Sequence, residues 1–368
     1  MHRPRIKYEH QPVRLGDDSV RIGGSLAGIA AEISDPDGTV WALLLLLDGT
    51  RTVDQVVADL VHRHPDVPPD TVRASIDKLA AAGYLEDADE PPEAVLTEAQ
   101  QERFGRGRAL WRWMDTAPRA TGWHAQLALR QARVTIVGVG GVGSTAALAL
   151  AQSGVGSLHL VEPDVVELSN LNRQVLYTEH DLGRPKVDVA VEVLRRYHGE
   201  AEITGEQITV VGVGMLRRLA TRCDVLLMAA DTPREIRSWT NRACLDTGTA
   251  WVHGGYHGPR AGVGLFVPGK GPCYDCVRTA TARERLASPP MTPWPDTSGT
   301  TRMHAVNAVS AGIAGHLAGH AVMSLITGIP RLRANREIGY NLITLQHSTF
   351  YESSEPEPDC PTCGKSVA

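Results

Sequence analysis

The sequence has few of the features that mark specialised classes of protein. It holds 6 cysteines in 368 residues, too few for the disulfide framework of a small secreted protein. Its longest apolar run, VWALLLLL at positions 40–47, is too short to cross a bilayer and predicts a buried helix. Neither sign of charge dominates, since 37 Lys and Arg stand against 42 Asp and Glu. We therefore expect a cytoplasmic protein with no membrane segment and no nucleic-acid partner.

The chain divides into three regions by pattern. Residues 1–90 combine short strand patterns with three helical patterns and a trailing strand, an order typical of a winged helix-turn-helix. We expect Gly49 to end the first helix, Thr52 to cap the second and Asp70 to cap the third, with Gly83 as its stop. The second region, 91–130, reads as an acidic, Pro-containing linker followed by helices.

The third region, residues 131–368, begins as an alternation of strands and helices. Apolar runs near 133–137, 157–163 and 223–232 alternate with helical patterns, which predicts a Rossmann-like, doubly wound, mostly parallel sheet with helices on both faces. After Ala250 the pattern changes to short strands and one apolar helix. The fold class is therefore α/β with a C-terminal extension and a small N-terminal α+β domain.

A glycine-rich loop separates the first strand of this region from its helix. Glycines at such a place let the backbone approach a phosphate, and the helix N-terminus favours negative charge. Glu162 ends the second strand, where a carboxylate can hold ribose hydroxyls. The loop alone favours an NAD or FAD domain. Its glycines are Gly138, Gly140, Gly141 and Gly143.

The polar residues that follow favour ATP over a nicotinamide. Two cations and two amides fall within one short stretch, namely Asn170, Arg173, Gln174 and Lys186. A triphosphate needs such charge because its own charge must be neutralised during attack at phosphorus, whereas hydride transfer does not. Asp231 ends another strand at the same edge of the sheet and is suited to bind Mg²⁺. The alternative is that Asp231 only caps the following helix.

The motifs GVGGVGS, VEPDVVELSNLNRQ, GRPK and AADTP resemble, in order, those of the ThiF/MoeB group of adenylyltransferases. The resemblance covers residues from about Leu96 onward. It implies ATP as cosubstrate, Glu162 as the ribose ligand with Asp164 in the same motif, and Asp231 as the Mg²⁺ ligand. It assigns the phosphate contacts to Asn170, Arg173 and Lys186. It also implies a homodimer in which an arginine before the glycine loop reaches the partner's ATP, a role that falls on Arg106 in ERFGRGR.

The cysteines form two CxxC pairs. Such pairs predict a tetrahedral Zn²⁺ site, and the family resemblance implies the same. Its ligands are Cys273, Cys276, Cys360 and Cys363. Cys223 and Cys244 read as buried apolar residues, and the segment VRTATARERLASPPMTPWPDTSGTTRM has no cysteine, so no residue is a candidate for thioester chemistry. The roles of His253 and His257 stay open.

The N-terminal region has 9 Lys and Arg against 16 Asp and Glu in residues 1–92, which argues against DNA binding. LLDGTRTVDQVVADLVHRHP followed by AAAGYLED resembles PqqD and related precursor-peptide recognition elements. This resemblance implies that the leader of a ribosomally made peptide binds as an added strand. An inert dimerisation unit is the structural alternative.

These features together predict an ATP-dependent adenylyltransferase that activates a carboxylate of a ribosomally made precursor peptide as acyl-AMP, with release of pyrophosphate. Two alternatives stay open. One is activation of a sulfur-carrier protein. The other is a non-catalytic leader-binding partner of an azoline-forming cyclodehydratase.

Overall fold

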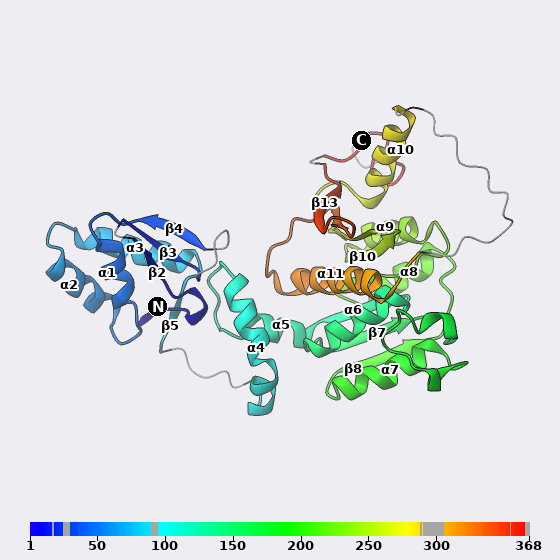
Figure 1. Cartoon of the computed structure of the whole chain (residues 1–368), viewed down its shortest axis with the longest axis horizontal. Coiled ribbons are helices and arrows are strands. Elements are labelled where there is room, and N and C mark those ends of the chain that lie inside the picture. Colours follow the sequence, from blue (N-terminus) through cyan, green and yellow to red (C-terminus); the bar gives the residue numbers. More distant parts are fainter. Residues whose placement is uncertain are drawn as a thin grey trace. The chain divides into compact units, whose positions relative to one another are not determined.

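The computed structural model describes residues 1–16, 18–24, 30–89, 95–287, 289, 305–353 and 355–364. The chain forms two compact units, Met1–Leu127 and Ala128–Ala368, which we call the N-terminal and C-terminal units (Figure 1). Each has its own hydrophobic core.

The N-terminal unit contains two small antiparallel sheets. Strands β2 (Val13–Leu15), β3 (Ser19–Ile22) and β4 (Ala31–Ser34) pair in that order, and β1 (Pro4–Ile6) pairs with β5 (Leu85–Asp87). A short 3-10 helix, η1 (Tyr8–His10), follows β1. Three helices complete the core, α1 (Thr39–Leu46), α2 (Val53–Arg63) and α3 (Pro69–Ala81).

The helix ends of this unit agree with the sequence in part. Thr52 caps α2 as expected, since its side chain accepts a hydrogen bond from the Gln55 amide. The expected cap at Asp70 is wrong, because α3 begins after Pro68 and Asp70 lies in its first turn, where its charge suits the helix dipole. Helix α1 ends at Leu46, short of Gly49. Gly83 follows α3 with a φ of 75°, as a helix stop requires.

Helix α4 (Glu98–Met114) belongs to the N-terminal unit. Thr97 caps it, and its buried residue Arg112 forms ion pairs with Glu9 at 3.1 Å and Glu86 at 2.7 Å. All three side chains are largely removed from solvent, so loss of one partner would leave a buried charge unpaired. This network fixes α4 to β5 and η1.

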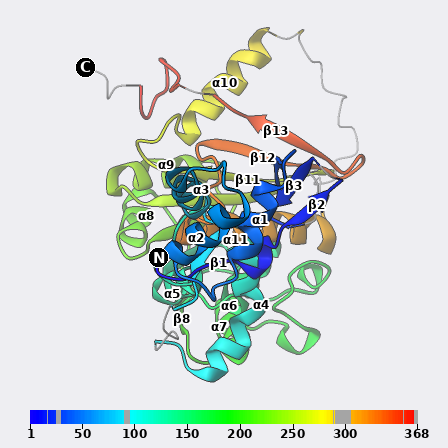
Figure 2. The ribbon, with the colours of Figure 1, turned by 90° about the vertical axis from the view of Figure 1, so that its left-hand side faces the viewer.

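The C-terminal unit has one large sheet, eight-stranded in the described residues, with the order β13-β12-β11-β10-β9-β6-β7-β8. Neighbouring strands from β10 to β8 are parallel, and those from β10 to β13 are antiparallel; Figure 2 shows β11, β12 and β13 side by side. The predicted alternation and mostly parallel sheet are therefore confirmed. The strands are β6 (Arg133–Val137), β7 (Ser157–Val161), β8 (Glu202–Glu206), β9 (Val225–Met228), β10 (Ala250–His257), β11 (Arg260–Phe266), β12 (Arg336–Asn341) and β13 (Gln346–Tyr351).

Helices cover both faces of this sheet. Helices α6 (Gly141–Gln152), α7 (Lys186–Tyr197) and α11 (Ala308–Thr327) pack together on one face, and α8 (Val213–Ala220) packs with α9 (Ile236–Thr247) on the other. By length and composition α11 could cross a membrane, but half of it is buried in this unit, where it packs on α6 and β10. The remaining helical segments are the short 3-10 helices η2 (Leu168–Asn170) and η3 (Glu179–Asp181) and the short helix α5 (His124–Gln131). A longer helix, α10 (Tyr274–Ala287), follows β11.

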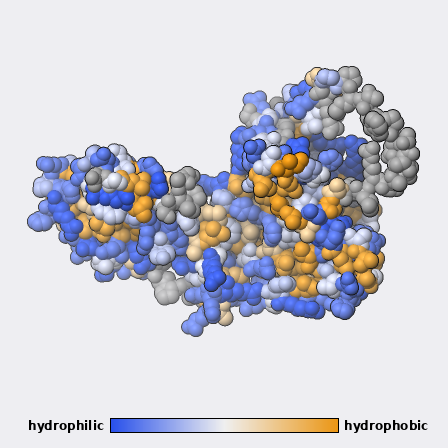
Figure 3. Space-filling view, viewed as in Figure 1, coloured by the Kyte–Doolittle hydropathy of each residue, from blue (hydrophilic) through white to orange (hydrophobic). Residues whose placement is uncertain are grey.

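The turn between β12 and β13 exposes apolar side chains. Ile343 is 77% exposed and Leu345 is 74% exposed. Figure 3 shows apolar surface near β13 on the C-terminal unit. Surface of this kind marks contact sites in soluble proteins.

Candidate active site

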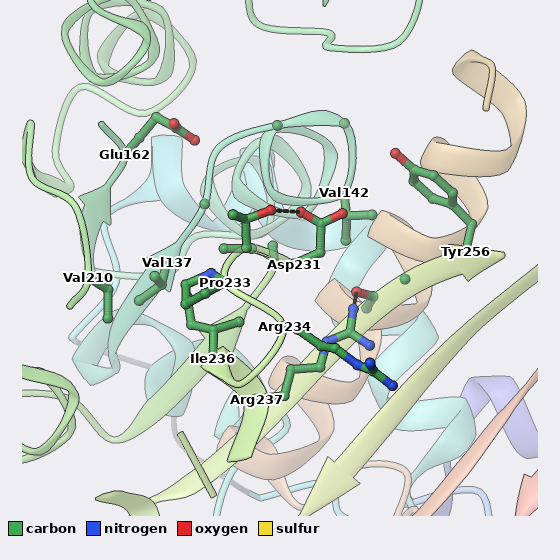
Figure 4. A pocket seen from close by; sticks show the side chains of 18 of the residues that line it. Val137, Val142, Glu162, Val210, Asp231, Pro233, Arg234, Ile236, Arg237 and Tyr256 are labelled. Carbon is green, nitrogen blue, oxygen red and sulfur yellow. Dashed lines mark hydrogen bonds between the residues drawn. The ribbon is translucent and has the colours of Figure 1, made fainter. Parts of the chain in front are cut away.

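A cavity of about 1170 Å³ lies at the carboxyl ends of β6, β7, β9 and β10 in the C-terminal unit. This is the edge at which open parallel sheets bind their ligands. The volume exceeds that of the usual small-molecule site, so the cavity has room for a nucleotide and part of a second substrate. Figure 4 shows Glu162 on one side of Asp231, with Arg234, Arg237 and Tyr256 on the other.

The glycine loop forms one wall of this cavity. Gly138 has a φ of 89°, and a Cβ there would lie 2.6 Å from the Ala230 nitrogen, so the turn from β6 into α6 requires glycine. Gly140 and Gly141 line the cavity at the N-terminus of α6, where free N–H groups favour an anion. Gly143 lies one turn further on and does not line it. A Cβ at position 143 would overlap the Gly138 carbonyl oxygen. Close packing of α6 against the loop therefore requires glycine at this position.

Glu162 directly follows β7 and is only 5% exposed. Its carboxylate accepts hydrogen bonds from the Val139 amide at 2.7 Å and the Asp164 amide at 3.1 Å. Each oxygen keeps a lone pair for a further donor, such as a ribose hydroxyl. Tyr177 donates to the Val139 carbonyl at 2.8 Å. Burial raises the pKa of this phenol, which therefore stays protonated and holds the loop.

The predicted phosphate contacts all line the cavity. Lys186, 5% exposed at the start of α7, donates to Asp164 at 3.1 Å. The Arg173 guanidinium is held by the Ser169 carbonyl at 2.8 Å and leaves further N–H groups unused. The side-chain oxygen of Gln174 is buried without a hydrogen-bond partner in the described residues. A buried polar atom of this kind fits a site completed by a ligand. We call this part of the cavity, formed by Gly138, Gly140, Gly141, Glu162, Asn170, Arg173, Gln174 and Lys186, the phosphate half.

Asp231 lies between β9 and α9, on the border of the phosphate half. Helix α9 begins at Ile236 and its cap is Glu235, so Asp231 is not a helix cap. Its carboxylate accepts only the Thr232 hydroxyl among the described residues, at 3.3 Å. An exposed carboxylate beside a triphosphate site suits Mg²⁺.

Several residues that the sequence did not single out also line the cavity. Arg234 and Arg237 precede or begin α9, Arg278 lies in α10, and Glu337 belongs to β12. We call the part formed by Arg234, Arg237, Tyr256, His257, Tyr274, Arg278 and Glu337 the acceptor half. Only Arg234 and Arg237 had a local signal, because they follow Asp231 closely. Arg278 and Glu337 reach the cavity through tertiary structure.

His253 is buried under the acceptor half, with its Nε2 2.7 Å from Glu337. Its ring packs among Trp251, Phe266 and Tyr274. Burial lowers the pKa of His253 more than the Glu337 carboxylate raises it, so the ring is neutral near pH 7. Burial raises the pKa of Glu337, but the hydrogen bond with His253 and the charge of Arg237 act against it, and the pKa stays below its ordinary value, so Glu337 is ionised.

Three other predicted residues are not among those that line the cavity. Cys223 and Cys244 are buried in the core of the C-terminal unit, as expected, and burial raises the pKa of both thiols. Neither lines the cavity. Arg106 is exposed on α4 in the N-terminal unit. Of the cysteine-free segment after the first CxxC pair, residues 288 and 290–304 lie outside the described residues.

The four CxxC cysteines form one cluster. Their sulfurs all lie within 4.8 Å of one another, with 3.6 Å between Cys273 and Cys360 and 3.3 Å between Cys276 and Cys363. A tetrahedral zinc site with Zn–S bonds of about 2.3 Å places its sulfurs about 3.8 Å apart. Asn241 donates to the Cys273 sulfur, as partners of metal thiolates do. The cluster therefore fits zinc.

The sequence profile of the ThiF family matches residues 115–362, more than half of the chain. The chain belongs to the ThiF family. The SAMP-activating enzyme E1 of Haloferax volcanii is 30% identical over 238 residues, 64% of this chain and 82% of that protein. The molybdopterin-synthase adenylyltransferase of Escherichia coli is 28% identical over 274 residues, 74% of this chain and all of that protein. This ThiF-family chain is an ATP-dependent adenylyltransferase.

The fold is also similar to that of E. coli MccB. Its structure with MccA-N7isoASN has a TM-score of 0.76 at 20% identity and covers 99% of this chain and 100% of MccB. A structure of MccB with ATP has a TM-score of 0.75, also at 20% identity, and covers 98% and 99%. At 20% identity this similarity shows that the folds are alike and no more. The matched residues include those of the N-terminal unit.

Proposed function

We propose that this ThiF-family adenylyltransferase activates a carboxylate of a ribosomally made precursor peptide. The observation that carries the proposal is the cavity of about 1170 Å³, in which a glycine loop, two cations and Asp231 adjoin an acceptor half lined by arginines. Support also comes from the fold, which resembles peptide-bound MccB over 99% of the chain. In the reaction a carboxylate oxygen attacks the α-phosphorus, the bond to the bridging oxygen breaks, and pyrophosphate leaves with the electron pair.

Each residue of the phosphate half has a role in this proposal. Glu162 binds the ribose, with Asp164 orienting Lys186, and Asn170 and Gln174 contact the phosphates. Arg173 and Lys186 stabilise charge as pyrophosphate leaves. Asp231 would hold Mg²⁺, which supplies further charge neutralisation when bound. We propose that Arg106 completes the site of a partner subunit in a homodimer, and the exposed apolar turn at Ile343 and Leu345 is a candidate contact surface.

We further propose that residues 1–90 form a PqqD-like, winged-helix recognition domain. Residues 91–130 then connect it to the adenylating domain, residues 131–368. We also propose that the enzyme acts in the cytoplasm. Strand β4 lies at the edge of its sheet in the described residues. An edge strand offers unpaired N–H and C=O groups to an added peptide strand. This arrangement favours a leader peptide over DNA, because the region is acidic.

Activation of a sulfur-carrier protein is the second candidate. It is supported by two relatives that are named as such enzymes, the molybdopterin-synthase adenylyltransferase and the E. coli ThiS adenylyltransferase, which is 30% identical over 259 residues, 66% of this chain and 90% of that protein. The non-catalytic alternative does not agree with an intact phosphate half.

Exchange of label between pyrophosphate and ATP tests the proposal. The full-length enzyme is mixed with short peptides encoded beside its gene, or with a purified sulfur-carrier protein ending in Gly-Gly. We expect exchange only with a precursor peptide and a mass increase matching AMP on that peptide. Substitution of leader residues by proline should weaken binding more than alanine does, because proline removes a donor from the strand ladder. Exchange that requires the carrier protein instead would contradict the proposal.

A further inference from the structure

The acceptor half of the cavity carries more positive charge than its own acidic residue balances. Arg234, Arg237 and Arg278 line it, against the single carboxylate of Glu337. Arg237 lies close enough to Glu337 to lower the pKa of that carboxylate, so these two charges offset each other. His253 adds no charge near pH 7, because burial lowers its pKa.

Arg234 and Arg278 have no carboxylate partner within ion-pair distance among the described residues. By contrast, Arg242 on α9 and Arg283 on α10 both pair with acidic residues outside the cavity. Arg234, just before α9, and Arg278, on α10, thus lack a carboxylate partner and line the cavity.

Arg278 is held in place by a chain of hydrogen bonds. It donates to the Ser238 hydroxyl at 2.6 Å, and that hydroxyl donates to Asp275 at 2.6 Å. Asp275 also accepts from Asn241 at 3.0 Å and from Thr362 at 2.6 Å, so α9 and the C-terminal segment both hold it. Arg278 uses one N–H in this chain and keeps others for a ligand. A guanidinium oriented in this way suits a planar carboxylate.

A phosphate group is a poorer fit for this position. The triphosphate already has the glycine loop, Arg173 and Lys186 in the phosphate half. Figure 4 shows Glu162 of that half across Asp231 from Arg234 and Arg237. A peptide ending in glycine or asparagine offers one carboxylate, which is consumed in the reaction with ATP. Such a peptide would leave the exposed guanidinium groups of Arg234 and Arg278 without a charged partner.

We propose that the acceptor half binds a second carboxylate of the substrate, so that the residue activated is a C-terminal aspartate or glutamate. One carboxylate reacts at the α-phosphorus while the other is bound by Arg278 and Arg234. This inference rests on the proposed peptide-activating function and names the substrate class. Arg278 and Arg234 are specificity-determining residues in it.

Matched synthetic peptides test the inference with the full-length enzyme. Pairs ending in Asp or Asn, and in Glu or Gln, share all other residues and carry a fluorophore at the N-terminus. Their binding is measured by anisotropy in the presence of a non-hydrolysable ATP analogue, and their turnover by ATP–pyrophosphate exchange. We expect the acidic member of a pair to bind about tenfold more tightly, as charge-assisted hydrogen bonds to a carboxylate provide.

Variants then assign this preference to the two arginines. In the double variant R234Q/R278Q the acidic and amide peptides should bind within about twofold of each other. The single variant R278K keeps a cation at this position and should therefore keep part of the preference for the acidic peptide. In both variants the KM for ATP should stay within about twofold of its value in the parent enzyme. If the two arginines bound the phosphates of ATP, this KM would rise. R242Q, which removes a paired arginine from α9, should keep the full preference.

The outcomes separate this inference from the proposed function. Exchange that is equal with acid and amide peptides would overturn the inference and leave peptide activation standing. Tighter binding of acidic peptides without any exchange would support carboxylate binding by the two arginines but overturn peptide activation. If the preference persists in R234Q/R278Q, these arginines do not bind the second carboxylate and the assignment is wrong.

Discussion

The phosphate half and the acceptor half of one cavity are built from the sequence in different ways. The phosphate half comes from a single stretch, residues 138–186, in which a strand, a glycine turn and a polar loop follow one another. The acceptor half takes Arg237 from α9, Arg278 from α10 and Glu337 from β12. A local stretch is enough to bind a nucleotide, whereas the surface that meets the second substrate depends on how distant elements pack. We therefore expect substitutions in the two halves to have different consequences.

The largest effect should come from the phosphate half. Lys186→Ala and Asp231→Ala should each lower ATP–pyrophosphate exchange by a factor of about 10² or more, because they remove charge that stabilises the transition state. The loss should be the same with every peptide that the enzyme accepts. Arg184→Gln is a matched control, since Arg184 lies two residues before Lys186 but pairs with Asp181 and Glu192 outside the cavity. A loss that varied with the peptide would contradict the separation of the two halves.

This difference also explains what could be predicted from sequence. The alternation of strands and helices predicted the parallel sheet, because period and length are local properties. The cluster from Glu162 to Lys186 could be found for the same reason. Glu337 could not, since it is brought to the cavity by antiparallel pairing of β12 with β11. The cap at Asp70 was mispredicted because Pro68 and Pro69 start α3 two residues earlier. Proline is favoured in the first helical turn.

The next largest effect should come from the cysteine cluster, which adjoins the acceptor half. Cys273 and Cys276 flank Tyr274 and Asp275, the residues that contact and position the arginines of that half. We expect about one Zn²⁺ per chain. Cys276→Ser should lower the melting temperature and abolish peptide-dependent exchange, because structural zinc binding contributes to folding.

ATP binding separates this expectation from general unfolding. Since the phosphate half is built from residues 138–186, it should still bind ATP in the zinc-depleted enzyme at low temperature, as measured by calorimetry. Cys244→Ser serves as the control, because Cys244 is a free cysteine outside the cluster. Protein without metal and with unchanged melting would rule out a structural zinc.

A smaller effect should follow acidification. The pKa of His253 lies below its ordinary value of about 6.5, chiefly because the ring is buried. As pH falls below 6.5 the unfolded chain binds a proton before the folded chain does, so this group lowers stability on the acid side. His253→Gln should reduce the fall in melting temperature between about pH 7.5 and 5.5 by a few degrees. His347→Gln, at an exposed position of β13, should leave that fall unchanged.

The smallest effect is expected for the cysteines outside the cluster. Cys223 and Cys244 lie in the core of the C-terminal unit, not on either half of the cavity, and burial raises the pKa of both thiols. A thioester requires a thiolate that can reach the acyl-adenylate, and neither residue meets that condition. Cys223→Ser and Cys244→Ala should therefore keep peptide-dependent exchange within about twofold of the parent enzyme. Intact-mass spectrometry during turnover should show AMP on the peptide and no peptide on the enzyme. A covalent adduct lost in either variant would mean that the core opens during the reaction and that the two halves of the cavity do not contain all of the chemistry.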